Sequence, residues 1–490
     1  MEEKSSSSVL SNIIWKLLER FGAQGVTLVV SIILARLLNP QVYGTIAIVT
    51  VFTSILQVFI DSGLGVALIQ KKDADDIDFS TVFFFNVFIC LIIYILLFFI
   101  SPLIAGIYNV DNLTSIIRVS GLVLIISGFK NVINAYISKK LLFKKYFFAT
   151  LGGTISAAII GIMMAYMGYG VWALVAQNLV NQTIDCIILW STIDWKPRLL
   201  FSFSRLSSLF NYGVKIFFSG LLDVIWNKMR QLIIGKKYTQ DDLAFYDRGN
   251  SIPLMFTDSL TSSIDSVLLP NMSVIQNDVQ SVKQMTKQAI KIGSFVLWPM
   301  MIGLAACSDN LIPILLTDEW VMVVPYLRIF CITYAFYPIH TANLNAIKAL
   351  GRSDIFLKLE IIKKIIGLII IVISMNYGTY YIALGCIVNS IISQIINSYP
   401  NKKLLHYSYL DQIRDISPSL LLSFAMGAVV YSVNYFQLTH ASLLILQVIL
   451  GVSFYFFACI IFKIDSFKYC MNQIKSLVLS VTNNNKMRDN

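Results

Sequence analysis

Residues 81–100 read TVFFFNVFICLIIYILLFFI, a stretch without a single ionised side chain. About twenty residues of this composition are enough to cross the hydrocarbon core of a bilayer as a helix. Because that layer holds no water, each backbone amide must find its partner within the segment, which favours the helix. Residues 441–462 repeat the pattern near the other end of the chain. The sequence therefore predicts an integral membrane protein.

The composition of the whole chain agrees with this prediction. Of 490 residues, 57% are hydrophobic and 13% are charged, and the mean hydropathy is +0.72. Soluble domains carry about 25% charged residues. The chain has too little polar surface to face water on all sides.

Apolar runs separated by Pro, Gly and charged residues predict an all-α polytopic fold with about fourteen transmembrane helices. The predicted helices are 11–37, 42–69, 80–108, 113–137, 146–168, 170–193, 208–235, 243–275, 288–316, 322–348, 354–376, 379–399, 416–435 and 441–463.

The links between these helices carry most of the net charge of +11, and they predict the orientation. Lys and Arg gather in every second link, as in Lys71/Lys72, the Lys139–Lys145 run and Lys402/Lys403, while the alternate links hold little beyond Lys236/Lys237. Cytoplasmic loops are the basic ones, so both termini are predicted to be cytoplasmic. We therefore expect the basic residues to set the orientation in the membrane and to contact anionic lipid headgroups, and we expect no nucleic-acid partner.

Parts of the sequence recur at a distance of about 204 residues. Phe52-Thr53, Asp61-Ser62 and Leu64 return as Phe256-Thr257, Asp265-Ser266 and Leu268. An even number of helices per repeat makes the repeats parallel. The predicted organisation is an N-terminal six-helix lobe at 1–195, a C-terminal six-helix lobe at 196–400, an extra helix pair at 401–465 and a basic cytoplasmic tail at 466–490.

Ionisable residues inside spanning helices usually face a cavity or a partner. They follow helical spacing on predicted helices 1, 2, 7 and 8, which predicts a polar cleft between the lobes. Clustered cations suit an anionic headgroup such as pyrophosphate, whereas the acids could balance them, bind sugar hydroxyls or exchange H⁺ or Na⁺. Alternatively, the groups pair across helices and only hold the lobes together. The candidate cations are Arg20, Lys215, Arg230, Lys130, Arg118 and Arg328, and the candidate acids are Asp61, Asp223, Asp258 and Asp265.

Signals for an enzyme are missing from the sequence. Gly235-Lys236 lacks the rest of a phosphate-binding loop, and the three histidines and seven scattered cysteines show no metal-ligand spacing. A lone His inside a spanning helix, such as His340, is more often a hydrogen-bonded structural residue than a proton carrier. We therefore expect a transporter with no cofactor, apart from a coupling ion, and no resident metal.

Several blocks of sequence resemble a known transporter family. The first runs from Trp15 to Leu34-Ala35-Arg36, Tyr43-Gly44, Asp61-x-Gly63 and Ile69-Gln70-Lys71-Lys72; later ones are Asn211-Tyr212-Gly213, Pro270 with Ile275-Gln276, and Leu316-Thr-Asp-Glu-Trp320. They resemble the polysaccharide transporters, the O-antigen and colanic-acid type flippases of the multidrug/oligosaccharidyl-lipid/polysaccharide exporter superfamily. Tyr43 stands where that family more often has Phe, and the charges of predicted helix 7 match no family-wide site.

The resemblance implies a flippase for undecaprenyl-pyrophosphate-linked oligosaccharide repeat units in a bacterial inner membrane, acting by alternating access of the two lobes. Implied partners are the lipid-linked substrate, membrane lipids and a polysaccharide polymerase with chain-length machinery, and a monomer is expected. The extra helix pair would shelter a polyprenyl tail or simply pack on the second lobe. The rival interpretations are a cation-coupled multidrug antiporter of the same superfamily, a polytopic glycan polymerase and, more remotely, a membrane scaffold.

Overall fold

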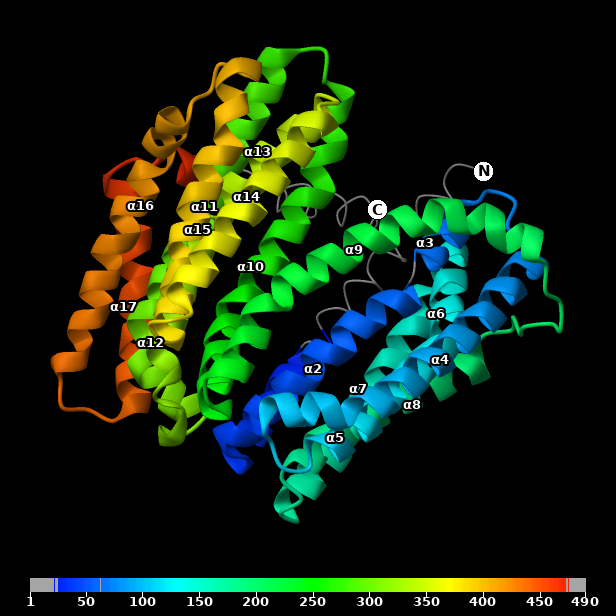
Figure 1. Cartoon of the computed structure of the whole chain (residues 1–490). Coiled ribbons are helices and arrows are strands. Elements are labelled where there is room, and N and C mark those ends of the chain that lie inside the picture. Colours follow the sequence, from blue (N-terminus) through cyan, green and yellow to red (C-terminus); the bar gives the residue numbers. More distant parts are fainter. Residues whose placement is uncertain (1–21, 23–24, 62, 473–474, 476–490) are drawn as a thin grey trace, which may run out of the picture. The chain divides into compact units, whose positions relative to one another are not determined.

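A computed structural model describes residues 22, 25–61, 63–472 and 475, and in this part of the chain every regular element is helical (Figure 1). A first helix covers Gly25–Leu37. The others are α2 (Pro40–Asp61), α3 (Leu64–Gln70), α4 (Asp76–Tyr108), α5 (Leu113–Ser120), α6 (Leu122–Lys140), α7 (Phe143–Tyr166), α8 (Val171–Thr192), α9 (Phe203–Lys237), α10 (Gln240–Val274), α11 (Val279–Leu315), α12 (Val323–Ala335), α13 (Tyr337–Ala349), α14 (Ser353–Ser374), α15 (Thr379–Leu404), α16 (Tyr409–Ser432) and α17 (His440–Ile461), with 3₁₀ turns at Asp318–Trp320 and Val433–Tyr435.

Each of the fourteen predicted helices has a counterpart among these elements, which confirms the all-α polytopic fold. For predicted helix 11–37 that counterpart is Gly25–Leu37, and most of the remainder lies outside the described residues. Three predicted helices are interrupted, however, and appear as the pairs α2/α3, α5/α6 and α12/α13. The interruptions are short, so each pair still occupies the place of one predicted helix.

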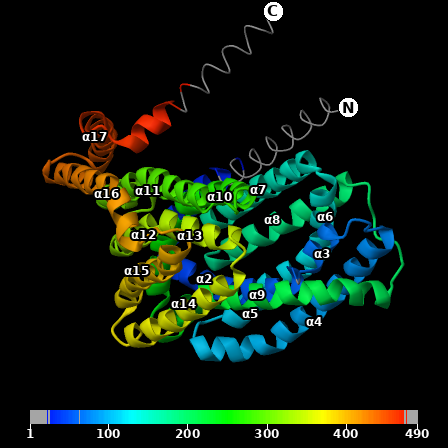
Figure 2. The same cartoon turned by 90° about the horizontal axis from the view of Figure 1, so that it is seen from above.

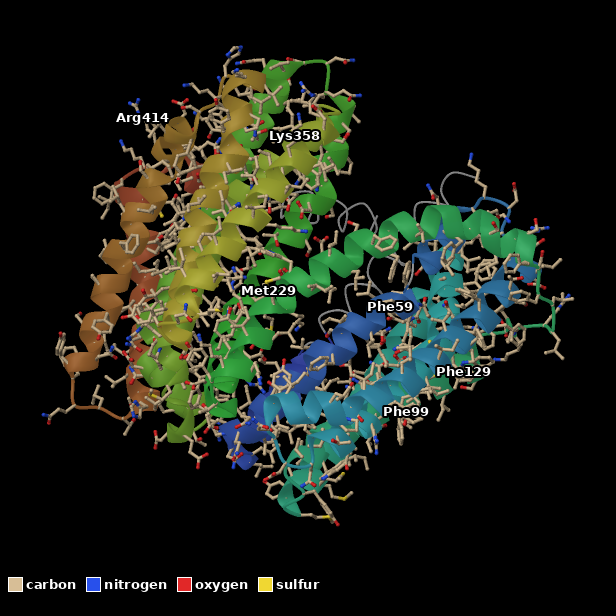
Figure 3. The ribbon with its side chains drawn as sticks, in the orientation of Figure 1. Phe59, Phe99, Phe129, Met229, Lys358 and Arg414 are labelled. Carbon is tan, nitrogen blue, oxygen red and sulfur yellow. The ribbon has the colours of Figure 1, made fainter. Side chains whose placement is uncertain are left out.

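Eight helical segments of the described chain are long and apolar enough to cross a membrane. The remaining six of the fourteen are the short helix Gly25–Leu37, α8, α9, α10, α12/α13 and α14. Large apolar side chains are exposed on many helices: Phe99 on α4 is 72% exposed, and Phe129 on α6 is 37% exposed (Figure 3). Lipid rather than water must cover such a surface. The protein is a multi-pass membrane protein.

The chain forms two compact units, Met1–Ala244 and Phe245–Asn490. Helix α9 belongs to the first unit because it packs along α2, α3 and α4. These contacts do not test the predicted repeat, whose boundaries at 195/196, 400/401 and 465/466 stay predictions.

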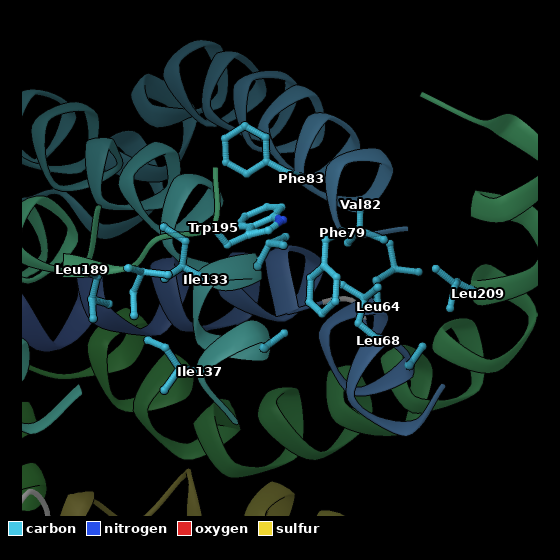
Figure 4. Close-up of a cluster of buried hydrophobic side chains, with 14 of the residues drawn as sticks. Leu64, Leu68, Phe79, Val82, Phe83, Ile133, Ile137, Leu189, Trp195 and Leu209 are labelled. Atoms are coloured by element: carbon cyan, nitrogen blue, oxygen red, sulfur yellow. The ribbon is translucent and has the colours of Figure 1, made fainter. Parts of the chain in front are cut away.

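The first unit has its core where α3, α4, α6 and α8 meet (Figure 4). Trp195, in the link after α8, stacks on Tyr136 with 5.8 Å between ring centroids, and Phe83 packs edge-on at 6.5 Å. Such aromatic contacts favour these geometries. They fasten the link that leads from α8 to α9 onto the end of the bundle.

An ionic cluster lies beside this core. Asp78, in the first turn of α4, has a fully buried carboxylate 2.7 Å from the Lys71 ammonium and 3.3 Å from the Arg205 guanidinium. Asp75 precedes α4 as its N-cap and accepts a hydrogen bond from the Asp78 backbone N–H at 2.9 Å. That bond, with the nearby Arg205 charge, lowers the pKa of Asp75 below its ordinary value. The cluster joins the α3–α4 link to the start of α9.

The second unit is built around α11, against which α12, α13, α16 and α17 pack. The pair α16 and α17, predicted as an addition to the repeats, lies beside α11 within this unit (Figure 2). Its contacts include an apolar group with Met426 and Val430, and the Asn310 amide of α11 donates to Asn434 at 2.7 Å and to Gln447 at 3.1 Å. Packing of the pair on the second unit is therefore observed, whereas shelter for a polyprenyl tail stays a prediction.

Candidate functional site

Two polar residues of predicted helix 2, Gln57 and Asp61, lie at the interruption between α2 and α3. Helix α2 ends at Asp61, and Gly63 adopts a left-handed conformation with φ +68°. The Asp61 carboxylate accepts hydrogen bonds from Gln57 at 3.3 Å and from Asn131 of α6 at 3.1 Å. The Asn131 amide also donates to the Ile60 carbonyl at 2.9 Å. A carbonyl beside a helix break in the candidate span Pro40–Gln70 thereby has a partner supplied by protein.

Helix α9 crosses the same interruption. A Cβ atom on Gly63 would lie 2.4 Å from the Gly213 carbonyl oxygen, which is closer than any Cβ contact allows. The rings of Phe59 and Phe217 meet edge-on nearby, 4.9 Å apart. Two blocks of the family resemblance, Asp61-x-Gly63 and Asn211-Tyr212-Gly213, therefore meet in space.

Lys130, predicted as a cavity cation, has protein partners inside the first unit. Its ammonium lies 2.5 Å from the Asp185 carboxylate and 2.9 Å from the Gln182 amide oxygen. The side chains of Lys130 and Asp185 are 13% and 6% exposed, so the pair is largely removed from solvent. A buried cation needs such a partner. This pair ties α6 to α8.

Arg118 and Arg328 each bind the neighbouring helix. Arg118 of α5 donates to the Ser101 hydroxyl of α4 at 3.1 Å, and its guanidinium carbon lies 3.9 Å from the centroid of the Phe98 ring. Arg328 of α12 pairs with Asp309 of α11 at 2.5 Å. These contacts match the alternative in which charges pair across helices. Their role toward a ligand stays a prediction.

Only one of the three cations predicted to hold the headgroup has a described side chain. Arg20 lies outside the described residues, and for Lys215 the structure gives the α9 backbone alone. Arg230, also on α9, is half-buried with its guanidinium carbon 5.9 Å from the Trp226 ring centroid. Asp223 is exposed on the same helix.

The predicted acids of α10 belong to the second unit. Asp258 and Asp265 are exposed, and Asp265 accepts a hydrogen bond from the Asn345 amide of α13 at 2.6 Å. In the same unit the His340 ring lies 3.1 Å from the Asn397 amide and 3.4 Å from the Ser390 hydroxyl. This hydrogen-bonded setting agrees with the structural interpretation of His340.

A polar pocket in the first unit was not predicted. Its cavity of about 190 Å³ is lined by the polar side chains of Thr27, Thr154, Gln177, Asn178 and Asn181. The sequence does contain a pattern that indicates it: residues 177, 181 and 185 are polar and four apart, so they share one face of a helix. The polar residues of predicted helices 1, 2, 7 and 8 follow the same spacing. Among the described residues, no three His, Cys, Asp or Glu side chains are grouped to hold a metal ion.

Comparisons with known proteins place the chain in a family. Residues 33–325 match the sequence profile of the family described as "Polysaccharide biosynthesis protein". The lipopolysaccharide biosynthesis protein WzxC of Escherichia coli K12 is 20% identical over 83% of this chain and 85% of its own length. The succinoglycan biosynthesis transport protein ExoT of Rhizobium meliloti is 22% identical over 72% of this chain and 71% of its own.

The fold is also found in solved structures. The lipid II flippase MurJ in an inward closed conformation superposes with a TM-score of 0.73 at 17% identity, over 92% of this chain and 98% of MurJ. An inward-facing multidrug resistance transporter of the MOP superfamily gives a TM-score of 0.61 at 14% identity, over 83% of this chain and 98% of that transporter. At these identities the likeness concerns the fold alone. With the family profile covering more than half of its residues, the chain belongs to the polysaccharide biosynthesis protein family of multi-pass membrane proteins.

Proposed function

We propose that this protein is a flippase that moves undecaprenyl-pyrophosphate-linked oligosaccharide repeat units from the cytoplasmic to the periplasmic leaflet of a bacterial inner membrane. The observation that carries the proposal is the family match over residues 33–325 in a chain of membrane-spanning helices. Relatives over most of its length are named as polysaccharide biosynthesis and transport proteins. The protein would supply surface polysaccharide synthesis without making or breaking a covalent bond.

The charged residues of α9 support an anionic cargo. Lys215 and Arg230 stand on one long helix, together with Lys228. A spanning helix holds several cations only where water, a partner or a ligand compensates them. We assign Arg20, Lys215 and Arg230 to the pyrophosphate, and the four candidate acids to charge balance or to exchange of H⁺ or Na⁺. A downstream polymerase with chain-length machinery is the expected partner, and the protein would act as a monomer.

The decisive test is reconstitution of the purified protein in liposomes with a lipid-linked oligosaccharide and a leaflet-sensitive probe. We expect the labelled lipid to change leaflets only in vesicles that hold the protein. Efflux of small organic cations without movement of that lipid would instead establish the multidrug antiporter. Imposed H⁺ and Na⁺ gradients, applied separately, identify the coupling ion by which of them accelerates transport.

The same assay tests the α9 cations. Arg230→Ala and Lys215→Ala are expected to slow flipping by about tenfold or more, because each removes a charge-assisted contact to phosphate. Arg20→Ala is expected to do the same. Lys402→Ala, which removes an exposed cation at the end of α15, is the matched control and should leave flipping unchanged. Wild-type rates in all three cavity variants would return these residues to a structural role.

A further inference from the structure

The pocket of the first unit combines uncharged donors and acceptors in a confined space. Five of its lining side chains are amides or hydroxyls, those of Thr27, Thr154, Gln177, Asn178 and Asn181. Each amide presents two donors and one acceptor, whereas the Thr154 hydroxyl already donates to the Thr150 carbonyl at 2.7 Å and offers its oxygen as an acceptor. Val30 and Ala157 complete the lining with apolar surface.

Small residues of α7 bring the amides of α8 close to its backbone. A Cβ atom on Gly153 would lie 2.9 Å from the Asn181 side-chain oxygen, and one on Gly161 would lie 3.0 Å from the Gln177 Cβ. Ala157 stands midway between these glycines and lines the pocket. Small residues at four-residue intervals allow close helix contact in membranes. They also set the positions of Gln177 and Asn181.

The pocket amides remain available to a ligand. Within the described part of the chain, the side chains of Gln177, Asn178 and Asn181 form no hydrogen bond with other protein groups. Thr27 and Asn178 are exposed, so the pocket opens beside them. Polar groups in a confined site lose free energy unless water or a ligand bonds them.

The charges around the pocket favour a neutral ligand. Among the residues that the structure describes, no charged side chain lines it, and the nearest charged group on α8, Asp185, is paired with Lys130 at 2.5 Å. Within that part of the chain, an ionic headgroup finds no counter-charge in the lining. A cavity of about 190 Å³ holds the volume of roughly six water molecules, which is comparable with a single sugar ring and smaller than the sites of drug-sized ligands.

We propose that this pocket binds one uncharged sugar residue of the transported oligosaccharide. The amides of Gln177, Asn178 and Asn181 bond the sugar hydroxyls, and Val30 and Ala157 contact the C–H face of the ring. This assignment rests on the proposed function, and it deepens that function by giving the glycan its own site apart from the headgroup cations. Recognition of the sugar then makes transport selective for the glycan as well as for the lipid.

The test measures sugar binding directly. The full-length protein, in nanodiscs free of sugar detergents, is probed by saturation-transfer NMR with the methyl glycosides of glucose, galactose, mannose and N-acetylglucosamine. We expect transfer to at least one glycoside in the wild type. In Asn178→Leu and Asn181→Leu, binding should weaken by about tenfold, because each loses its amide bonds and gains apolar bulk.

Thr183→Leu is the matched control, since it places the same new side chain on α8 outside the pocket lining. It should bind the glycosides like the wild type. Asn178 is exposed, so its variant is expected to fold even if Asn181→Leu does not. The absence of transfer to all four glycosides, or wild-type binding by both pocket variants, would overturn the proposal.

Two further measurements separate this inference from the proposed function. The lipid-linked oligosaccharide should displace the bound glycoside. If it does not, the pocket binds free sugars only, and the proposal that it holds a sugar of the transported oligosaccharide is overturned. In liposomes, normal flipping by both pocket variants contradicts the sugar site and leaves the flippase intact. A wild type that binds glycosides but flips no lipid contradicts the flippase instead.

Discussion

At the scale of single residues, several lysines of the basic links also stabilise helix ends. The ammonium of Lys139 donates to the Leu68 carbonyl in the last turn of α3 at 3.0 Å, and that of Lys145 donates to the Thr192 carbonyl at the end of α8 at 2.5 Å. The last carbonyls of a helix have no partner within it, and cations there also interact well with the helix dipole. The residues that predict orientation therefore contribute to the fold of the links as well.

The buried carboxylate of Asp78 gives the first residue-scale prediction. Asp78→Asn removes the buried negative charge that Lys71 and Arg205 share, while Arg205 keeps its more exposed pair with Asp75 at 3.4 Å. We expect the midpoint of thermal unfolding to fall by about 3 °C or more, since the loss of a buried charged partner is costly. Fluorescence-detected melting of the purified protein measures the shift.

Asp76→Asn, two residues away, is the control for this prediction. Asp76 pairs with Arg198 at 3.4 Å, but both side chains are about half exposed or more. Such surface pairs contribute little. Equal melting midpoints for the two variants would show that the buried cluster does not stabilise the first unit.

Residue roles were harder to predict than residue locations. Lys130 was predicted as a cavity cation because it is a charged residue inside a spanning helix, but its partner Asp185 lies on another helix, 55 residues along the chain. Spacing within one helix carries no information about such a partner. The pocket on α8 was not predicted for a different reason. Its side chains are neutral, whereas the predicted polar cleft rested on charged residues.

At the scale of elements, the places of the helices along the chain followed from the sequence, because each long apolar run marks a segment able to cross the bilayer. The interruptions were not predicted, although two had local signals. Gly63 provides the left-handed residue at the start of α3, and Pro338 lies in the first turn of α13. Proline lacks the N–H that would continue the preceding helix. In a long apolar run, a single Gly or Pro changes the composition little. Hydropathy therefore predicts one continuous helix across the interruption.

The packing of α7 against α8 gives the element-scale prediction. In Gly153→Ala, the new Cβ would lie 2.8 Å from the Asn181 backbone oxygen, and backbone cannot move aside as a side chain can. We expect the helices to separate, with a lower melting midpoint and weaker glycoside binding. Melting and saturation-transfer NMR measure the two effects.

Gly106→Ala serves as the comparison, because nothing lies within 4 Å of a Cβ at that position of α4. In a helix interior alanine is preferred to glycine by about 1 kcal/mol. This variant should be as stable as the wild type or more so. A Gly153→Ala protein that behaves the same way would argue against close α7–α8 packing.

At the scale of the whole molecule, the orientation of the fourteen helices can be tested by cysteine labelling. The predicted topology places Asp73 and Arg352 in the cytoplasm and Asp111 and Glu319 outside, and all four are exposed. We expect an impermeant maleimide added to intact spheroplasts to label Asp111→Cys and Glu319→Cys. Asp73→Cys and Arg352→Cys should react only after the membrane is opened.

The natural cysteines give a low background for this experiment. Five of the seven are buried, and Cys186 and Cys470 are partly exposed. Labelling of the protein without added cysteines measures the background from these two residues. Labelling of Asp73→Cys in intact cells would reverse the predicted orientation, and a change of side between Asp111 and Glu319 would show that the helix count between them is wrong.

The hydrogen bond from Asn131 to the Ile60 carbonyl also bears on the order of events during synthesis. The amide that supports the α2/α3 interruption lies 71 residues downstream, so it leaves the ribosome well after α2. Until α6 has inserted, the interruption within the candidate span Pro40–Gln70 lacks this partner, and an unsatisfied carbonyl in a bilayer is costly. We therefore expect the α2/α3 interruption to gain this hydrogen bond after α6 has inserted, when the first unit closes around it.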